Sequence, residues 1–230
     1  MRKLVHELFK GPINISEKLT YIVVENPNVF YKMVKSLCNQ VLNKTNAEEA
    51  FVLLDDESKL ELSKSAIMFS DLLNFEINSK KIKNELIKKI EKDARNLNEN
   101  KLTQINDLIQ DYFEELFGRY FINVNYLEEV DLCDFLKLYK VEVCNEDDSL
   151  LTTLINWLTS FTELTKIYTF LFVNLSTFLS QKELIELEKY AEYNKVSIIL
   201  FENLCEHLTN IREINVIDND LCHIIVHKMV

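Results

Sequence analysis

The sequence from residue 168 to residue 203 reads YTFLFVNLSTFLSQKELIELEKYAEYNKVSIILFEN, and this stretch decides the fold class. Thr169–Val173 and Val196–Phe201 are apolar runs without alternation, the pattern of strands buried on both faces. The residues between them predict one helix. Two buried strands joined by a helix form a parallel crossover unit, which is right-handed in nearly every known case. The chain therefore contains an α/β layer of the kind that often binds nucleotides.

The helix between these strands has clear start and stop signals. Ser180 is placed to cap it, and Glu183, three residues later, completes a capping box. Leu179 and Leu184 are spaced for a hydrophobic staple across the helix start. Asn194–Lys195 follows the last apolar position and predicts the end of the helix.

The glycine content argues against a nucleotide-hydrolysing enzyme. The chain has only Gly11 and Gly118. A phosphate-binding loop needs closely spaced glycines, because its backbone amides approach the phosphate in conformations that other residues avoid. Neither of the common glycine-rich phosphate motifs can be written in this sequence. A nucleotide-type layer without a phosphate loop indicates a binding or architectural protein.

Charge and hydropathy limit the classes of partner. The net charge is −11, which argues against a uniformly basic coat for nucleic acid. A local basic surface remains compatible with it, because salt screens charges beyond ~8 Å. No apolar run approaches the roughly 18 residues that span a bilayer, and the start of the chain is not a signal peptide. We expect a cytoplasmic protein without membrane contact.

The cysteines and histidines give no metal or disulfide signature. Five cysteines are widely spaced without a C-x-x-C pair, which fits reduced, mostly buried side chains. His223 and His227 share a face if HIIVH is a strand. Two histidines are too few for a zinc site, so a structural role is favoured for both.

Periodicity divides the chain into an α/β part and a helical insertion. Residues 78–164 follow a helical period with few breaks, whereas residues 1–77 and 165–230 are rich in strands. We expect an α/β head domain from the two outer segments and an α-helical leg domain from the middle one. The strands expected in the head, besides the two above, are Leu4–Phe9, Ile13–Ile15, Leu19–Val24, Ala50–Leu54, Glu213–Ile217 and Ile224–His227.

A basic run on the first helix of the insertion has two interpretations. Lys81, Lys88, Lys92 and Arg95 cluster on one helix face, opposite much of the apolar stripe. Composition alone favours a solvated face with i,i+4 ion pairs. The alternative is contact between lysines and the phosphates of a DNA duplex.

Two acidic segments raise the question of metal binding. Asn123, Asn125, Glu128, Glu129 and Asp131 place oxygen side chains before a helix, where hard cations such as calcium find ligands. Capping of the following helix explains the same residues more simply. Residues 55–57, Asp55-Asp56-Glu57, are a candidate metal-nuclease cluster, although three adjacent acids after a strand usually form a turn and no further ligand is tied to them by spacing. No serine or cysteine shows a nucleophile signature.

The order and spacing of several motifs resemble one known family, the DNA-end-binding adaptation protein of type II-A CRISPR systems. The motifs cover nearly the full length, and none of them is a catalytic signature. They are the strand Leu19–Val24 running into Glu25, the stretch Asp71–Asn78 (DLLNFEIN), Leu132–Val143, Phe170–Asn174 (FLFVN), Leu179–Tyr190 and Ile198–Glu202.

This resemblance implies a fold and a function. The implied fold is α/β, with a P-loop-ATPase-like (Rossmann-like) head that lacks the phosphate-binding loop and an inserted α-helical leg. The implied function is a non-catalytic homotetrameric ring that holds double-stranded DNA in a basic hole, threads onto DNA ends and is stabilised by calcium. It would support spacer acquisition in antiviral defence, beside the CRISPR integrase complex and the effector nuclease.

The resemblance also suggests site residues. Lys137 stands where the family has a lysine, and with Lys80, Lys81 and Lys83 it makes the predicted DNA-binding set. Asn123 and Asn125 stand where the family has acids, so we expect calcium sites that are weaker or fewer than in relatives. Two other classes stay open: a divalent-metal-dependent nuclease using Asp55, Asp56 and Glu57, and a protein scaffold of the adaptation complex that binds no DNA.

Overall fold

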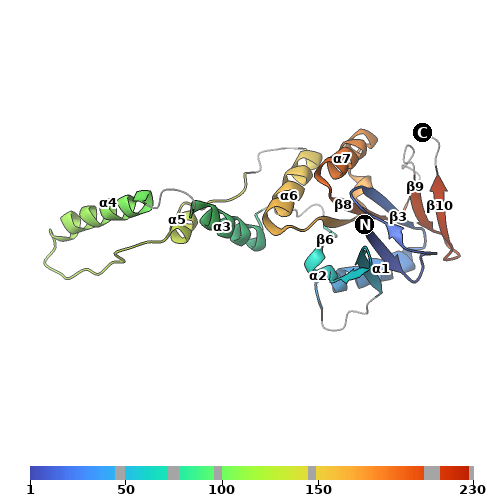
Figure 1. The fold of residues 1–230 in the computed structure, drawn as a ribbon, viewed down its shortest axis with the longest axis horizontal. Helices are drawn as coiled ribbons and strands as arrows, with labels where there is room; N and C mark the ends of the chain where they lie inside the picture. The colour runs from blue at the N-terminus through green and yellow to red at the C-terminus, as the bar shows by residue number, and fades with distance from the viewer. Residues whose placement is uncertain (45–49, 72–77, 96–99, 145–148, 205–212, 228–230) are drawn as a thin grey trace. The chain divides into compact units, whose positions relative to one another are not determined.

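The computed structural model describes residues 1–44, 50–71, 78–95, 100–144, 149–204 and 213–227 (Figure 1). The chain divides into two compact units. The first, here called the head, comprises Met1–Phe75, Asp147–Thr162 and Lys166–Val230; the second, the leg, comprises Glu76–Glu146 and Glu163–Thr165. None of the helices in the described residues combines the length and hydropathy that a bilayer-spanning segment requires.

A six-stranded sheet forms the centre of the head, in the order β10-β9-β3-β8-β7-β6. All neighbours in it pair in parallel except β10, which is antiparallel to β9. The protein is therefore a mixed α/β fold with a parallel sheet, as expected. The strands are β3 (Leu19–Val24), β6 (Ala66–Phe69), β7 (Thr169–Val173), β8 (Ser197–Glu202), β9 (Glu213–Ile217) and β10 (His223–His227).

The predicted crossover unit is confirmed. β7 leads through the short 3-10 helix η1 (Leu175–Thr177) into α7 (Gln181–Asn194) and then into β8, which is parallel to β7. Ser180 and Glu183 form the capping box in both directions. Lys195 ends the helix in the left-handed conformation, at φ 55°. Both strands of the unit are almost entirely buried, because helices or strands cover each face of the sheet.

One face of the sheet is covered by α7 and by α6 (Leu150–Thr165). The Trp157 ring of α6 lies edge-on to Phe69 of β6, with centroids 4.1 Å apart, and 5.8 Å from the ring of Phe170. The hydroxyls of Thr159 and Tyr190 are 2.9 Å apart and join the two helices. Aromatic packing thus fixes α6 over the β6–β7 side of the sheet.

The opposite face packs on α1 (Pro27–Val41) and on a second, antiparallel sheet. Asn26 caps α1 by accepting the N–H groups of Asn28 and Val29, and Pro27 occupies the first turn. The small sheet has the order β2-β1-β4-β5. Its strands are β1 (Arg2–His6), β2 (Ile13–Asn14), β4 (Phe51–Asp55) and β5 (Ser58–Leu60), and the short α2 (Leu62–Ser65) follows.

The expected strand Leu4–Phe9 was too long at its end. The chain leaves β1 after His6 and turns, because the Phe9 N–H donates to the carbonyl of His6 at 3.0 Å. The His6 Nδ1 accepts the N–H of Leu8 at 3.2 Å and stabilises the same turn. The turn places the Phe9 ring in the core beside Phe51, with their centroids 6.4 Å apart.

The leg is helical in its described residues. It contains α3 (Lys80–Ala94), α4 (Asn100–Phe117) and α5 (Leu132–Leu138). α3 packs against α5. The Asn78 side-chain amide donates to the Val143 carbonyl at 2.8 Å, and its Oδ1 accepts the Val143 N–H at 2.9 Å. These two bonds join the segment before α3 to the segment after α5. Of the motif Asp71–Asn78, residues 72–77 lie outside the described part of the chain.

Candidate functional site: the carboxyl edge of the sheet and the basic leg helix

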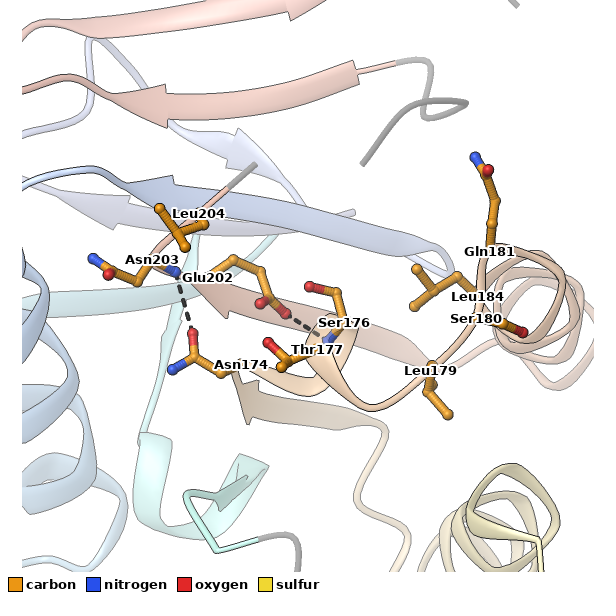
Figure 2. A pocket seen from close by; sticks show the side chains of 10 residues that line it. All are labelled: Asn174, Ser176, Thr177, Leu179, Ser180, Gln181, Leu184, Glu202, Asn203 and Leu204. Atoms are coloured by element: carbon orange, nitrogen blue, oxygen red, sulfur yellow. Dashed lines mark hydrogen bonds between the residues drawn. The ribbon is translucent and has the colours of Figure 1, made fainter. Parts of the chain in front are cut away.

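The carboxyl ends of parallel strands are where open α/β sheets bind ligands. A pocket of about 520 Å³ lies at that edge of the head (Figure 2). It is formed by the turns that follow β7 and β8 and by the start of α7, and its polar lining comes from Asn174, Ser176, Thr177, Ser180, Gln181, Glu202 and Asn203. This edge can bind phosphate only if the backbone amides around the pocket are free to donate to it.

A buried carboxylate occupies the pocket floor. Glu202 ends β8 and is 1% exposed. Its Oε1 accepts the backbone N–H of Ser176 at 3.0 Å (Figure 2). Burial raises the pKa of Glu202 above its ordinary value, and the hydrogen bonds from Ser176 and Leu175 partly offset that rise. A carboxyl group of the protein itself thus bonds to the loop amide.

Asparagine side chains brace the strand ends to one another. The Asn203 N–H donates to Asn174 Oδ1 at 3.2 Å, and the Asn203 side-chain amide donates to the Val24 carbonyl at 3.0 Å. At the start of α7 the Ser180 N–H donates to Glu183 Oε2 at 2.7 Å. The N–H groups of Ser176 and Ser180 are therefore taken by the protein's own carboxylates.

The turn after the central strand leaves no room for a phosphate loop. Only Glu25 and Asn26 separate β3 from α1. The Glu25 N–H donates to the Ile217 carbonyl at 3.0 Å, and its carboxylate accepts from the Asn219 side chain at 3.2 Å. A phosphate loop needs several free backbone amides, whereas this connection is two residues long and its first amide is already bonded.

The basic run of the leg lies on α3, which Ser79 caps through the Ile82 N–H at 3.5 Å. Three of its cations form ion pairs: Lys83 with Glu142 (2.8 Å), Lys88 with Glu85 (2.8 Å) and Lys89 with Glu163 (3.5 Å). Within the described residues Lys80, Lys92 and Arg95 form none.

The α3 cations remain accessible despite these pairs. Lys88, Lys92 and Arg95 are exposed and follow one another at spacings of four and three residues, which places them on one helix face. Exposed ion pairs contribute about 0–1 kcal/mol, so a phosphate competes easily for such a lysine. The described α3 residues thus present an exposed basic face.

The predicted DNA-binding lysines occupy two helices. Lys80, Lys81 and Lys83 lie on α3, although the Lys81 side chain falls outside the described part of the structure. Lys137 lies on α5, 3.0 Å from Asp134. The Asp134 carboxylate and, less strongly, Cys133 raise the pKa of Lys137 above its ordinary value. α3 and α5 pack together, so the set shares one part of the leg.

The segment that joins α4 to α5 carries the predicted calcium ligands. Three α4 side chains hold it: Asn106 bonds both backbone groups of Val130 at 3.1 Å, Gln110 donates to the Glu128 carbonyl, and Phe113 contacts the Tyr126 ring at 5.1 Å. The side chains of the four predicted ligands, Asn123, Asn125, Glu128 and Glu129, are exposed.

These four residues offer the oxygen ligands that a hard cation prefers, but they are fewer than a calcium ion takes. All offer oxygen atoms, and in the described structure no ion pair engages Glu128 or Glu129. Calcium takes six to eight oxygens, so water, backbone carbonyls or another chain would complete the shell. Two amides in place of carboxylates leave less negative charge to attract the ion.

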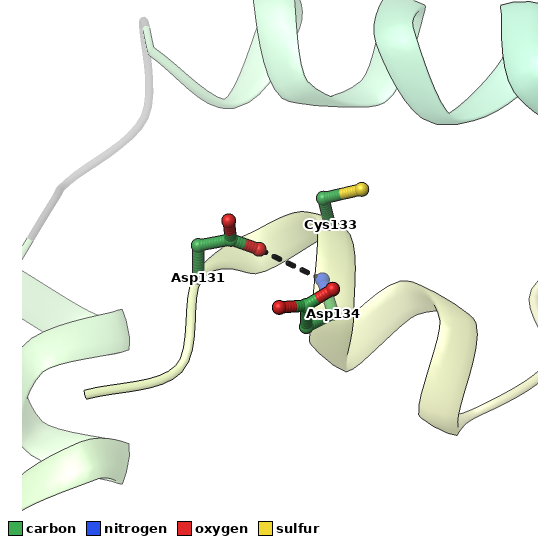
Figure 3. A group of neighbouring side chains, drawn as sticks. All are labelled: Asp131, Cys133 and Asp134. Atoms are coloured by element: carbon green, nitrogen blue, oxygen red, sulfur yellow. Dashed lines mark hydrogen bonds between the residues drawn. The ribbon is translucent and has the colours of Figure 1, made fainter. Parts of the chain in front are cut away.

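The closest group of potential metal ligands in the described residues joins Asp131, which sequence reasoning placed in the oxygen-rich segment, to Cys133 and Asp134, which it missed. Asp131, Cys133 and Asp134 place one ligand atom each within 4.8 Å of one another at the start of α5 (Figure 3). Asp131 Oδ1 caps the helix by accepting the Asp134 N–H at 2.8 Å, and Asp134 pairs with Lys137. Helix capping explains the position of Asp131, as the capping interpretation of this region predicts, and an ion pair explains that of Asp134.

The acidic turn Asp55-Asp56-Glu57 closes the hairpin between β4 and β5. The Met1 ammonium pairs with Asp55 at 3.4 Å and with Asp56, and Arg2 lies 3.7 Å from Asp55. The hydrogen bond from that ammonium lowers the pKa of Asp56. Cations of the protein itself already pair with Asp55 and Asp56, so the arrangement does not favour the nuclease hypothesis.

His223 is a structural residue. Its Nδ1 accepts the Lys10 N–H at 3.1 Å, and its Nε2 lies 3.3 Å from Asn215 Oδ1. Because Nδ1 is an acceptor, the ring is neutral with its proton on Nε2. His227, four residues on, is exposed.

Comparisons with known proteins point to one family. A model of the CRISPR-associated protein family Cas_Csn2 matches residues 43–221. No curated protein matches the chain significantly. Among solved structures, a nucleotide-free ATP-binding cassette from an ABC transporter is 12% identical, with a TM-score of 0.46 over 100% of this chain and 92% of that one. CbiO1 from Clostridium perfringens, part of the ABC transporter complex cbiONQ, is 13% identical, with a TM-score of 0.44 over 94% and 83%.

Proposed function

This chain belongs to the Cas_Csn2 family of CRISPR-associated proteins, a type II-A adaptation family, and from that premise we propose that it is a non-catalytic clamp on double-stranded DNA ends. In this proposal several copies, four by the family resemblance, close a ring around the duplex. The clamp supports the acquisition of new spacers beside the integrase complex and the effector nuclease.

The observation that carries the proposal is the exposed basic face of α3 in a protein of net charge −11. Lys88, Lys92 and Arg95 place three cations along two helical turns, and Lys80 and Lys83 extend the basic surface toward the start of the helix. Such a strip suits the phosphates of a duplex and reads no base sequence. Acidic residues elsewhere do not cancel it, because salt screens them beyond ~8 Å.

The carboxyl edge of the head supports the non-catalytic part. Glu202 and Glu183 accept the amides of Ser176 and Ser180, and two residues connect β3 to α1. We propose that the head is a Rossmann-like scaffold without its phosphate loop, and that the leg is a helical insertion in it. Such a head positions the leg and performs no chemistry.

Calcium is the proposed stabilising ion. Asn123, Asn125, Glu128 and Glu129 supply oxygens, and bound calcium would add positive charge to an otherwise acidic segment. A divalent ion there favours association with DNA or with a second copy, since both are rich in anionic groups.

A gel-shift titration with linear duplex and with covalently closed circular duplex of the same sequence tests the proposal. Binding to linear DNA with little binding to circles supports a clamp that loads at ends. Equal binding to both refutes it. The same DNA is then incubated with magnesium or manganese, and shortened products would establish the nuclease alternative. Absence of any shift at low salt, with retained association with the integrase complex, would favour the scaffold alternative.

A further inference from the structure

β10 is an edge strand of the large sheet of the head. It pairs with β9 on one side, and no described residue pairs with its other side. Its sequence, HIIVH, contains no charged residue, proline or glycine. Ile224 and Ile225 are 45% and 50% exposed. Natural proteins usually blunt such an edge with lysine, proline or a bulge, because it is a template for another strand.

The register of β10 shows which backbone groups face the open edge. The Asp218 N–H donates to the Cys222 carbonyl at 3.1 Å, and the Cys222 N–H donates to Asp218 Oδ1 at 2.8 Å, so residues 218 and 222 stand at a hydrogen-bonded position of the β9–β10 ladder. The Ile217 carbonyl of β9 accepts the Glu25 N–H, so it faces β3 and not β10. In an antiparallel ladder hydrogen-bonded pairs alternate, so Ile224 and Val226 bond to β9. The N–H and C=O groups of His223, Ile225 and His227 then point away from the sheet. The described part of the chain offers them no backbone partner.

We propose that β10 pairs antiparallel with β10 of a second copy, centred on Ile225. Centring places Ile225 opposite Ile225, His223 opposite His227, and Ile224 opposite Val226 of the second copy. The three outward-facing residues meet one another as hydrogen-bonded pairs, which gives about six backbone hydrogen bonds across the two-fold axis. The two six-stranded sheets then form one continuous sheet.

Self-complementarity selects a second copy of this chain as the occupant. The strand reads the same in both directions by residue class: imidazole, aliphatic, aliphatic, aliphatic, imidazole. Each aliphatic side chain therefore meets an aliphatic one, and no like charges meet at neutral pH. A shift of the pairing by one residue would oppose inward-bonded groups to outward-facing ones, and a shift by two would leave one outward-facing residue of each β10 without a partner in the other, so the centred register forms the most hydrogen bonds.

This inference rests on the proposed function in one respect, since it names one interface of the ring. Light scattering of the full chain with Ile225→Pro tests it. Proline at residue 225 removes only an outward-facing N–H, which edge strands tolerate. We expect the assembly mass to fall about twofold, because one of the interfaces that close the ring is lost. Ile225→Thr keeps the N–H and serves as the matched control, with the parent mass expected.

Circular dichroism and the thermal midpoint report whether the proline variant is folded. If the folded Ile225→Pro variant has the same assembly mass as the parent, the β10 inference is wrong, and the proposed DNA clamp is not affected by that result. A parent chain that is monomeric with and without calcium overturns both.

Cysteine cross-linking tests the register independently of stability. Ile224 and Val226 of two copies form a non-hydrogen-bonded pair with Cα atoms about 4.5 Å apart, close enough for a disulfide. In a background with Cys144 and Cys222 replaced by serine, a mixture of Ile224→Cys and Val226→Cys chains should form the disulfide on mild oxidation. Mass spectrometry of the joined peptide identifies it. Faster self-coupling of Ile224→Cys than of the mixture would contradict the register.

Discussion

The carboxylate of Glu202 accepts the backbone N–H of Ser176 at 3.0 Å, at the edge of the sheet where a nucleotide-binding protein of this architecture holds its ligand. The group that accepts the Ser176 N–H is thus a side chain of the protein and not a bound ligand. Because both residues are nearly fully buried, this bond is a structural element of the head. It joins the turn that follows β7 to the end of β8.

Replacing Glu202 with alanine should weaken the head measurably. The substitution leaves the buried Ser176 N–H without its acceptor, which costs about 1–3 kcal/mol of unfolding free energy. Urea unfolding followed by circular dichroism measures it. Glu186→Ala, on the exposed face of α7, is the matched control and should stay within about 0.5 kcal/mol of the parent. Equal stability of the two variants would show that the Glu202 bond contributes nothing.

The basic face of α3 should set the salt dependence of DNA binding. Each phosphate contact contributes a slope of about −0.9 in log affinity against log salt. Replacing Lys88, Lys92 and Arg95 together with glutamine should therefore reduce the slope by roughly 2–3. Fluorescence anisotropy of a labelled duplex at several salt concentrations gives both values.

The control for this experiment is a triple substitution of equal charge on the head. Lys182, Lys189 and Lys195 lie on or next to α7 and are exposed. Their replacement with glutamine should leave the slope unchanged. A similar loss of slope in both triples would mean that net charge, rather than α3, governs binding.

The head should lose stability as the pH falls below neutrality. Burial lowers the pKa of both His6 and His223, and each Nδ1 accepts a backbone N–H. Both rings pack on Phe9, with centroids 5.5 and 5.6 Å away. The unfolded chain takes up these protons near pH 6.5, whereas the folded head takes them up only at lower pH. The unfolding free energy therefore falls as pH drops through about 6.5.

Urea unfolding at pH 7.5 and at pH 5.5 measures how the unfolding free energy depends on pH. His223→Gln removes one of the two titrating groups and should flatten the pH dependence. His227→Gln changes an exposed residue of the same strand and should keep it. A parent chain that is more stable at the lower pH would contradict the assignment of neutral, buried imidazoles.

Calcium should act through the segment before α5. A ligand that binds only the folded state stabilises it by RT ln(1 + [L]/Kd), about 2.7 kcal/mol at a hundredfold excess over Kd. Replacing Glu128 and Glu129 with glutamine should abolish most of the rise in thermal midpoint that calcium produces. Asp107→Asn with Asp111→Asn, on exposed positions of α4, is the matched control. An unchanged calcium response in the Glu128/Glu129 variant would assign the ion elsewhere.

Local signals predicted the elements and missed the contacts between them. The capping box of Ser180 and the uninterrupted apolar strands define the crossover unit, because short-range spacing is enough for both. The bracing of Asn203 against Asn174 and Val24 was not predictable, since it depends on which strand ends become neighbours. The sequence did offer one signal for the role of Glu202, which is its position directly after the buried apolar run Ile198–Phe201.

The candidate site shows the same limit. Helical spacing placed the α3 lysines correctly on one element. It gave no sign that Lys83 would meet Glu142 or that Asn106 would hold the backbone of Val130, because those pairings arise from the packing of distant segments. The DNA and calcium assignments therefore rest on the family and on charge, and they stay predictions until binding is measured.

The most direct test of the clamp uses a linear duplex whose ends are either free or blocked. Biotin at both termini with bound streptavidin is added before or after the protein, and retention is followed in high salt. The account predicts no loading when both ends are blocked first, and retained protein when they are blocked after loading. Equal loading onto free-ended and pre-blocked DNA would contradict it.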